Sequence, residues 1–148
     1  MLDMIRSLGD SLFSLLTDDP VRPTIPTVER VGNNRDVFVL RDGDNVHAIT
    51  CVSYQDDVPS SELELFRSCS NPTIVVFYTI WSYKSGAGRE LLFGVVDYIK
   101  KNKPEITRFV TLSPKSDMAA KFHLKNGAKV FRENETSINY EYEIAGLV

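Results

Sequence analysis

The stretch that decides the fold is TIVVFYTIWSYKSGAGRELLFGVVDYIKK, residues 73–101. Its first nine residues, 73–81, are almost wholly apolar and rich in β-branched and aromatic types, which predicts a buried central strand. From residue 88 the apolar positions recur at helical spacing, and a helix is expected over 88–102. Gly86 lies between them, and Gly88 begins the expected helix. The centre of the expected fold is therefore a buried strand that runs through a glycine loop into a helix.

The residues that follow predict a return to the sheet. RFVTL at 108–112 is a second buried strand, so strand, helix and strand should form a parallel unit. Residues 116–125 predict a short helix, with Ser116 as its N-cap and Asn126-Gly127 as its stop. An antiparallel hairpin of 129–133 and 137–144 should complete the chain.

The residues that precede the central strand predict a hairpin and an N-terminal helix. Segments 36–41 and 46–54 alternate apolar and polar residues around an Asp-Gly-Asp-Asn turn. Residues 60–68 fit a short helix or a strand, and periodicity does not decide between them. Residues 2–16 fit an amphipathic helix, and we expect it to pack on the core rather than to lie on a membrane. Its apolar positions are Leu2, Ile5, Leu8, Leu12, and Leu15 or Leu16.

Length and composition indicate one soluble domain. The 148 residues suit a single core, and the 43% hydrophobic and 25% charged content is that of a globular protein. These patterns predict an α+β domain over 1–148, with a mixed, mostly antiparallel sheet, a central parallel strand-helix-strand unit and flanking helices. The net charge of −3 argues against a general nucleic-acid binder, so any anion site must be built locally.

The cysteines and the N-terminus indicate the compartment. Cys51 and Cys69 form no framework of disulfides and no metal-binding motif, so we expect free thiols in a cytoplasmic protein without a metal. No apolar stretch approaches the roughly 20 residues of a membrane span. Acidic residues at the N-terminus argue against a secretory signal or a transit peptide.

The glycine loop is the first candidate binding site. A strand that enters Gly86-Ala87-Gly88 and then a helix brings free backbone N–H groups to the positive end of a helix dipole, where they can bind a pyrophosphate. Lys84 and Arg89 supply positive charge. Taken alone, the loop is equally well explained as a tight turn, and it matches neither dinucleotide-binding nor P-loop spacing.

The order of these elements resembles the GNAT superfamily of acyl-CoA enzymes. That superfamily writes its loop as Q/R-x-x-G-x-G/A, which Gly86 and Gly88 fit, whereas Tyr83 stands at the Gln/Arg position. The resemblance implies that the loop binds coenzyme A. The residues it implies are Lys84, Ser85, Gly86, Ala87, Gly88 and Arg89.

Several blocks are more closely similar to the catalytic domain of malonyl-CoA decarboxylase, itself a GNAT fold. The matching blocks are FYTI at 77–80, residues 85–90, FVTLSP at 109–114, FHLKNGAKVFR at 122–132 and NYEY at 139–142. The similarity runs from about 36 to 143. It includes no match to that family's helical N-terminal domain or to its helical insertion before the FH block, so the chain resembles a minimal form.

The decarboxylase resemblance also implies a catalytic set, which is Glu90, Ser113, His123 and Tyr142. A histidine could orient the carboxylate or protonate the enolate, and Ser113 could hold either the histidine or the carboxylate. Each residue also has a structural interpretation. His123 alone could be a packing histidine, Ser113 a strand stop and Tyr142 an ordinary strand tyrosine. His47, the other histidine, is expected to be structural.

Three functions remain open at this point. The leading hypothesis is an enzyme that converts malonyl-CoA to acetyl-CoA and CO2, with or without acetyl transfer to an amine or a carrier protein. The second is a GNAT acetyltransferase that uses acetyl-CoA. The third is a non-catalytic acyl-CoA-binding protein. The chain could also form a homo-oligomer.

Overall fold

The centre of the molecule is the parallel unit that the sequence predicts. The computed structural model describes residues 1–7 and 9–143. Strand β4, Ile74–Ser82, runs through the glycine loop into helix α1, Ala87–Asn102, and the chain returns in strand β5, Arg108–Thr111. β4 and β5 pair in parallel. The predicted bounds of all three elements are confirmed to within one residue.

The other strands extend this unit on both sides, and their pairing is antiparallel. The described residues form one eight-stranded sheet in the order β1-β2-β3-β4-β5-β8-β6, with β7 paired to β8. Its remaining strands are β1 Leu2–Ile5, β2 Arg35–Asp42, β3 Asn45–Gln55, β6 Ser113–Pro114, β7 Ala128–Glu133 and β8 Ser137–Tyr142. The expected α+β class and both hairpins are therefore confirmed, and residue 144 of the second hairpin lies outside the described residues.

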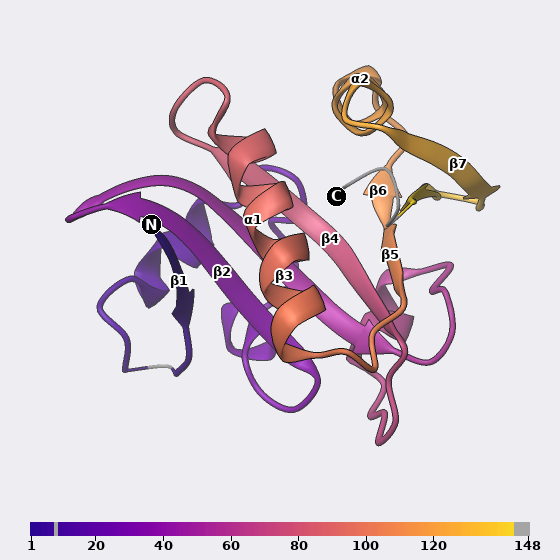
Figure 1. Cartoon of the computed structure of the whole chain (residues 1–148), viewed down its shortest axis with the longest axis horizontal. Helices are drawn as coiled ribbons and strands as arrows, with labels where there is room; N and C mark the ends of the chain where they lie inside the picture. The colour runs from indigo at the N-terminus through magenta and orange to yellow at the C-terminus, as the bar shows by residue number, and fades with distance from the viewer. Residues whose placement is uncertain (8, 144–148) are drawn as a thin grey trace.

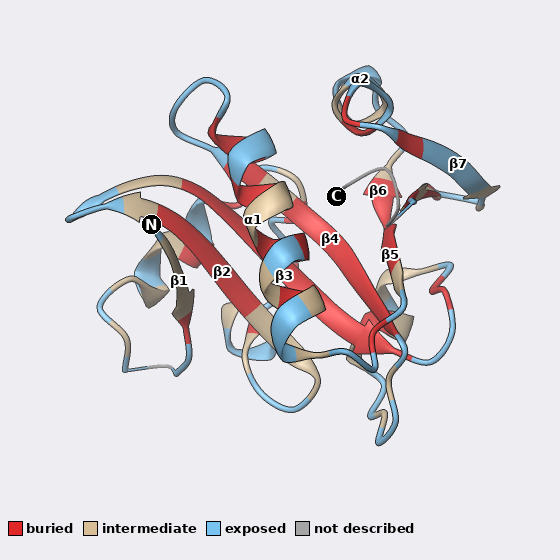
Figure 2. Ribbon diagram, in the orientation of Figure 1, coloured by how far each residue is buried: buried red, intermediate tan, exposed pale blue. Residues whose placement is uncertain are grey.

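Each face of the sheet carries its own apolar core. Helix α1 packs across β2, β3 and β4 on one face, where Leu91, Val95 and Ile99 are buried (Figure 1). The opposite face is covered by irregular segments that bury Leu16 and Ile25. The strands between them are buried along most of their length (Figure 2). Helix α2, Asp117–Lys125, packs beside β7, and Ser116 caps it by accepting the N–H of Ala119 as predicted.

The predicted N-terminal helix over 2–16 is wrong. Residues 2–5 form β1, which completes the edge of β2, and Phe13–Asp18 forms the short 3-10 helix η1. The free backbone groups along β2 gain a partner that a helix could not supply. Leucines spaced by three and four serve two short elements here as well as they would serve one helix, with Ile5 and Leu16 both buried. Leu8 lies outside the described residues.

Two further segments are 3-10 helices. The undecided segment 60–68 contains η3, Glu62–Phe66, and the proline-rich connector leads into η2, Thr27–Arg30. Within the described part of the chain, neither α-helix has the length and hydrophobicity that a membrane span requires.

β4 and β5 separate halfway along β4. Phe77 and Thr111 form their last pair, and the N–H of Leu112 still donates to the carbonyl of Phe77 at 3.0 Å. Tyr78 is an extra residue in the pairing of β4 with β3, since Val52 pairs with Phe77 and Cys51 already pairs with Thr79. Such a bulge bends a strand and raises its twist. Beyond it β4 continues to Ser82, while the chain leaves β5 for β6.

Arg22 joins the two strands at the point where they separate. Its Nε donates to the carbonyl of Tyr78 at 2.9 Å, and its Nη2 donates to the carbonyl of Leu112 at 2.8 Å. Its Nη1 forms an ion pair with Glu62. Parallel strands that part leave such carbonyls without ladder partners, and an unpaired buried carbonyl is costly. The guanidinium therefore supplies hydrogen bonds to both carbonyls and fixes the point at which the strands separate.

A buried ion pair holds the segment that carries Arg22. Asp19 and Arg30 meet at 2.6 Å, and both side chains are at most 1% exposed. The second carboxylate oxygen of Asp19 accepts the N–H groups of Val21 and Arg22 and the hydroxyl of Thr79. The connector is thereby attached to β4.

We expect Arg30→Met to lower the free energy of unfolding by about 3–5 kcal/mol, because it leaves the buried Asp19 carboxylate without its cation. Urea unfolding followed by fluorescence measures the change. Arg67→Met is the matched control, because Arg67 pairs with Glu64 at the surface, where an ion pair contributes about 0–1 kcal/mol. Equal losses in the two variants would contradict the assigned role of the Asp19–Arg30 pair.

Candidate functional site

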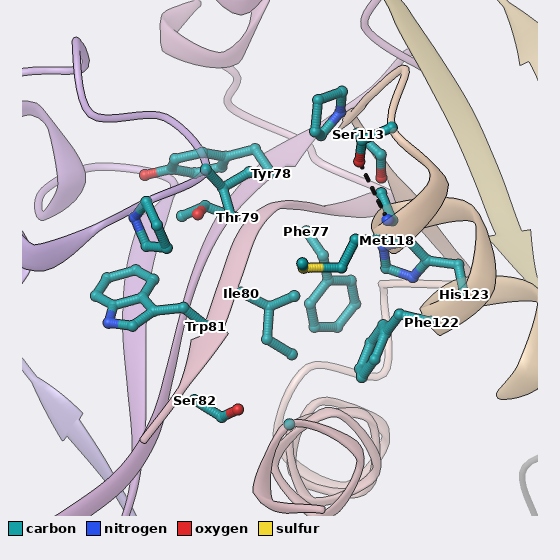
Figure 3. A pocket seen from close by; sticks show the side chains of 16 residues that line it. Phe77, Tyr78, Thr79, Ile80, Trp81, Ser82, Ser113, Met118, Phe122 and His123 are labelled. Atoms are coloured by element: carbon teal, nitrogen blue, oxygen red, sulfur yellow. Dashed lines mark hydrogen bonds between the residues drawn. The ribbon is translucent and has the colours of Figure 1, made fainter. Parts of the chain in front are cut away.

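A cleft of about 310 Å³ opens where β4 and β5 separate. One wall is the half of β4 that extends beyond its last pair with β5. The other wall is built from β6 and α2. Figure 3 shows Phe77 and Ile80 of β4 on the side of Phe122 and His123, with Met118 beside them, whereas Tyr78 and Trp81 lie on the other side of the strand. The lining residues are Pro20, Val21, Phe77, Tyr78, Thr79, Ile80, Trp81, Ser82, Gly88, Ser113, Pro114, Ser116, Met118, Ala119, Phe122 and His123. Ser113 and His123, ten residues apart in the chain, thus face one cleft.

Ser113 reaches the cleft because the chain bends after β5. It is buried in the two-residue strand β6, which pairs with β8 rather than with β4. Its Oγ lies 2.8 Å from Oγ1 of Thr111. The Ser-Pro sequence therefore ends one strand and also places a hydroxyl at the edge of the split.

His123 is held by two tyrosines of β8. Its Nδ1 lies 2.7 Å from the hydroxyl of Tyr142, and its ring stacks on Tyr140 with 5.2 Å between centroids. The imidazole is only 5% exposed. Among the described residues Nε2 has no hydrogen-bond partner, and the ring borders the cleft. Tyr142 lies behind His123 and does not line the cleft.

Burial lowers the pKa of His123 from 6.5 to about 4. The ring is therefore neutral at neutral pH. Burial also raises the pKa of Tyr142, so its hydroxyl keeps its proton. The Tyr142 hydroxyl has one hydrogen, and Nδ1 is its one described partner. Donation to Nδ1 satisfies that hydrogen and leaves the ring proton of His123 on Nε2, beside the cleft.

The depressed pKa makes stability depend on His123 in a defined pH range. The unfolded chain binds a proton near pH 6.5 and the folded chain only near pH 4, so acidification between these values favours unfolding. We expect His123→Gln to remove up to about 3 kcal/mol of this pH dependence between pH 6.5 and pH 4. Urea unfolding at several pH values measures it, and an unchanged slope in the variant would contradict the buried neutral state.

The glycine loop reaches the cleft at Gly88, in the first turn of α1. Gly86 has φ of +80°, the left-handed conformation that favours glycine, and it precedes the first turn of α1. Among the described residues, the N–H groups of Ser85, Gly86, Gly88 and Arg89 have no hydrogen-bond partner. A Cβ on Gly88 would lie 3.3 Å from the ring of Phe122, so glycine permits α1 to approach α2. These amides form an anion-binding arrangement.

The residues of the predicted coenzyme-binding set differ in burial and in their hydrogen-bond partners. Lys84 and Ser85 are exposed, whereas Ala87 is buried in the first turn of α1. Nη1 of Arg89 donates to Asn126 at 3.2 Å, which links α1 to the end of α2. Tyr83, at the position of the motif's Gln or Arg, is hydrogen-bonded to Asp18 and Trp81.

Glu90 lies apart from the other predicted catalytic residues. It lies in the first turn of α1, it is exposed, and it is absent from the cleft lining. Ser113 and His123 meet at the cleft, with Tyr142 behind His123. Within residues 1–7 and 9–143, no cluster of three metal-ligating side chains occurs.

Sequence reasoning missed three residues that shape the site. Arg22 sits in a proline-rich connector where a charged residue suggests solvent exposure, and no local pattern predicts its burial. Thr111 and Tyr140 occur in strand patterns in which threonine and tyrosine are expected on packing grounds alone. The alternation of NYEY could have placed Tyr140 and Tyr142 on one face, because residues two apart in a strand share a face.

Three solved structures match this arrangement. Malonyl-CoA decarboxylase from Agrobacterium vitis aligns with a TM-score of 0.82 at 16% identity, over 97% of this chain and 60% of that one. Malonyl-CoA decarboxylase from Cupriavidus metallidurans gives 0.78 at 15% identity, over 99% and 62%. A Bacillus subtilis acetyltransferase in complex with CoA gives 0.64 at 13% identity, over 96% and 97%.

The chain has a GNAT-like fold. It spans about 60% of the length of the two decarboxylases, which share its fold over almost all of its own length. No protein-family model matches the sequence, and no curated protein sequence matches it.

Proposed function

We propose that this chain binds acyl-CoA and decarboxylates malonyl-CoA to acetyl-CoA and CO2. The observation that carries the proposal is the meeting of Ser113 and His123 at one cleft, with His123 fixed by Tyr142. The two decarboxylases share the fold, which supports the proposal at the level of architecture. The 1–148 segment acts here as a single acyl-CoA-binding domain.

The cleft suggests how the coenzyme lies. The pyrophosphate binds the free amides of Ser85, Gly86, Gly88 and Arg89, with Lys84 supplying positive charge. The pantetheine arm follows the half of β4 that has no pairing with β5, from Ser82 towards Tyr78 (Figure 3). Strand geometry makes that path roughly 13 Å long, at about 3.3 Å per residue. The thioester then lies at the split, beside Ser113 and His123.

The proposed reaction needs no group other than the substrate and these side chains. The bond between the carboxylate carbon and the methylene carbon breaks, and its electron pair moves into the thioester as an enolate. CO2 leaves, and one proton is transferred to the methylene carbon, giving acetyl-CoA. In total, malonyl-CoA and one proton give acetyl-CoA and CO2.

His123 supplies that proton. In the free protein the ring is neutral, with its hydrogen at Nε2 facing the cleft. A bound carboxylate beside the ring favours the imidazolium, so substrate binding takes up a proton from solvent. The imidazolium donates Nδ1–H to Tyr142, whose hydroxyl can accept as well as donate. Nε2 then transfers its proton to the enolate carbon, which leaves the ring neutral with its hydrogen on Nδ1. Proton exchange with solvent restores the Nε2–H form before the next turnover.

Ser113 and the apolar walls favour loss of the carboxylate. The Ser113 hydroxyl orients the carboxylate, while Ile80, Trp81 and Met118 give the cleft apolar walls. A carboxylate in such surroundings loses hydration, and its charge spreads as the enolate forms. Glu90 takes no part in this scheme, because it is exposed outside the cleft.

The composition of the cleft favours this reaction over acetyl transfer to an amine. An amine substrate is a cation at neutral pH and needs a carboxylate to bind it or a base to deprotonate it. No aspartate or glutamate occurs among the described residues that line the cleft, and a histidine with a pKa of about 4 is a weak base. The cleft is also open, which disfavours a purely structural remnant.

We expect His123→Ala to lose about 10²–10⁴-fold in the rate of malonyl-CoA decarboxylation while it retains affinity for acetyl-CoA. Mass spectrometry of the acyl-CoA products measures the first, and calorimetry measures the second. His47→Ala, which removes the chain's other histidine from β3, is the matched control and should keep full activity. A wild type that releases no CO2 but acetylates an added amine would replace this proposal with the transferase.

Substrate binding should also be linked to proton uptake. Near pH 6 the free His123 is neutral and the carboxylate of bound malonyl-CoA raises its pKa, so the complex should gain up to one proton. Titration calorimetry in buffers of different ionisation enthalpy measures this number, with a CoA thioether that carries the carboxylate and cannot decarboxylate in place of malonyl-CoA. Acetyl-CoA has no such carboxylate and should bind without uptake. Equal uptake by both ligands, or none in wild type, would contradict the assigned role of His123.

A further inference from the structure

Thr111 contacts Ser113 from behind and does not itself line the cleft. It is the last residue of β5 and is fully buried. Its Oγ1 makes two hydrogen bonds, one with Oγ of Ser113 at 2.8 Å and one from the N–H of Tyr140 at 3.0 Å. Nothing in the proposed reaction uses this hydroxyl.

Hydrogen bonds hold both the hydroxyl and the backbone carbonyl of Thr111. The N–H of Tyr140 belongs to β8, and the ring of Tyr140 stacks on His123. The carbonyl of Thr111 accepts Nδ2 of Asn139 at 2.8 Å, and the same amide group donates to the carbonyl of Pro59 at 2.9 Å. The backbone of Thr111 is thus held independently of its side chain. The backbone of Ser113 is held by its pairing with β8, and the Thr111 hydroxyl is the described group that contacts the Ser113 hydroxyl.

One hydrogen lies between the two hydroxyl oxygens, and either residue can supply it. The Tyr140 N–H occupies one lone pair of Thr111 Oγ1 in both cases. When Ser113 supplies the hydrogen, its oxygen presents lone pairs to the cleft. When Thr111 supplies it, the hydrogen of Ser113 is free to donate to a ligand in the cleft. A carboxylate can accept only, so it selects the second arrangement.

We propose that Thr111 is a positioning residue that orients Ser113 and lets its hydroxyl donate to the carboxylate of a bound acyl-CoA. The inference rests on the proposed function, because it takes Ser113 as the group that holds that carboxylate. Acetyl-CoA offers no carboxylate at this position. Thr111 therefore contributes to selection of a carboxylated acyl group and acts through Ser113.

The test is a double-mutant cycle between Thr111 and Ser113. We expect Thr111→Val, which keeps the shape and removes the hydroxyl, to lower kcat for malonyl-CoA about 10–100-fold with KM changed less than about threefold. Thr111→Ser restores the hydroxyl and should recover most of the rate. In a Ser113→Ala background, Thr111→Val should change kcat less than about twofold, because the residue it acts through is gone.

Ser53→Ala separates positioning from general loss of stability. The hydroxyl of Ser53 is buried and donates to the carbonyl of Leu65, away from the cleft. This variant should lower the melting temperature about as much as Thr111→Val and leave kcat unchanged. An equal kcat loss in both variants would overturn the inference.

The remaining outcomes separate this inference from the proposed function. If wild type decarboxylates malonyl-CoA and Thr111→Val costs the same rate in both backgrounds, the inference is wrong and the function stands. If wild type binds malonyl-CoA without turnover, the function is wrong. The same cycle is then measured on affinity for malonyl-CoA. If Thr111→Val lowers this affinity only where Ser113 is intact, the inference is supported. If it lowers the affinity equally in the Ser113→Ala background, the inference is overturned. A wild type that neither binds nor decarboxylates malonyl-CoA overturns both.

Discussion

The guanidinium of Arg22 fixes the point at which two parallel strands separate. A parallel pair that stops halfway leaves the buried carbonyls of Tyr78 and Leu112 without ladder partners. Arg22 donates one hydrogen bond to each of them. The Asp19–Arg30 ion pair in turn holds the segment that carries Arg22. The cleft exists because β4 continues past this point while the chain leaves β5. Ser113 and His123 line the cleft that this separation opens.

The electrostatics of the site follow from the same geometry. α2 covers the split from the side opposite β4, so His123 is buried between Phe122 and the β8 tyrosines, with ring centroids 5.2 Å from Phe122 and from Tyr140. Burial without an acidic partner makes the ring neutral. The cleft therefore offers hydrogen-bond donors and apolar walls instead of fixed charge. A carboxylate bound beside the neutral ring favours its protonation, which links ligand charge to the state of His123.

The local parts of the fold were predictable from sequence, because each rests on a pattern of adjacent residues. The apolar run at 73–81, the glycines and the helical spacing after 88 determine β4, the loop and α1. The same reasoning failed at the N-terminus, where leucines at helical spacing belong to a strand and a 3-10 helix. The free edge of β2, which decides between the two, is remote in sequence.

The site was less predictable, because its geometry depends on contacts between distant segments. Ser113 and His123 were singled out by resemblance, and the cleft brings both together; Glu90 came from the same resemblance and is exposed elsewhere. No sequence signal marks Tyr78 as the bulge or Arg22 as its partner, 56 residues away. Thr111 reads as an ordinary β-branched residue of a buried strand, and its hydrogen bonds appear only when β5 and β8 are paired.

The central claim is that an acyl-CoA lies in the split with its acyl carboxylate at Ser113 and His123. A crystal structure with a CoA thioether that carries a carboxylate and cannot decarboxylate tests it most directly. We expect the pyrophosphate on the free amides of the glycine loop, which belong to Ser85, Gly86, Gly88 and Arg89. We expect the pantetheine arm along Tyr78–Ser82, and the carboxylate within hydrogen-bond distance of Ser113 Oγ and His123 Nε2. A coenzyme bound outside the split, or a carboxylate turned to solvent away from both side chains, would contradict it.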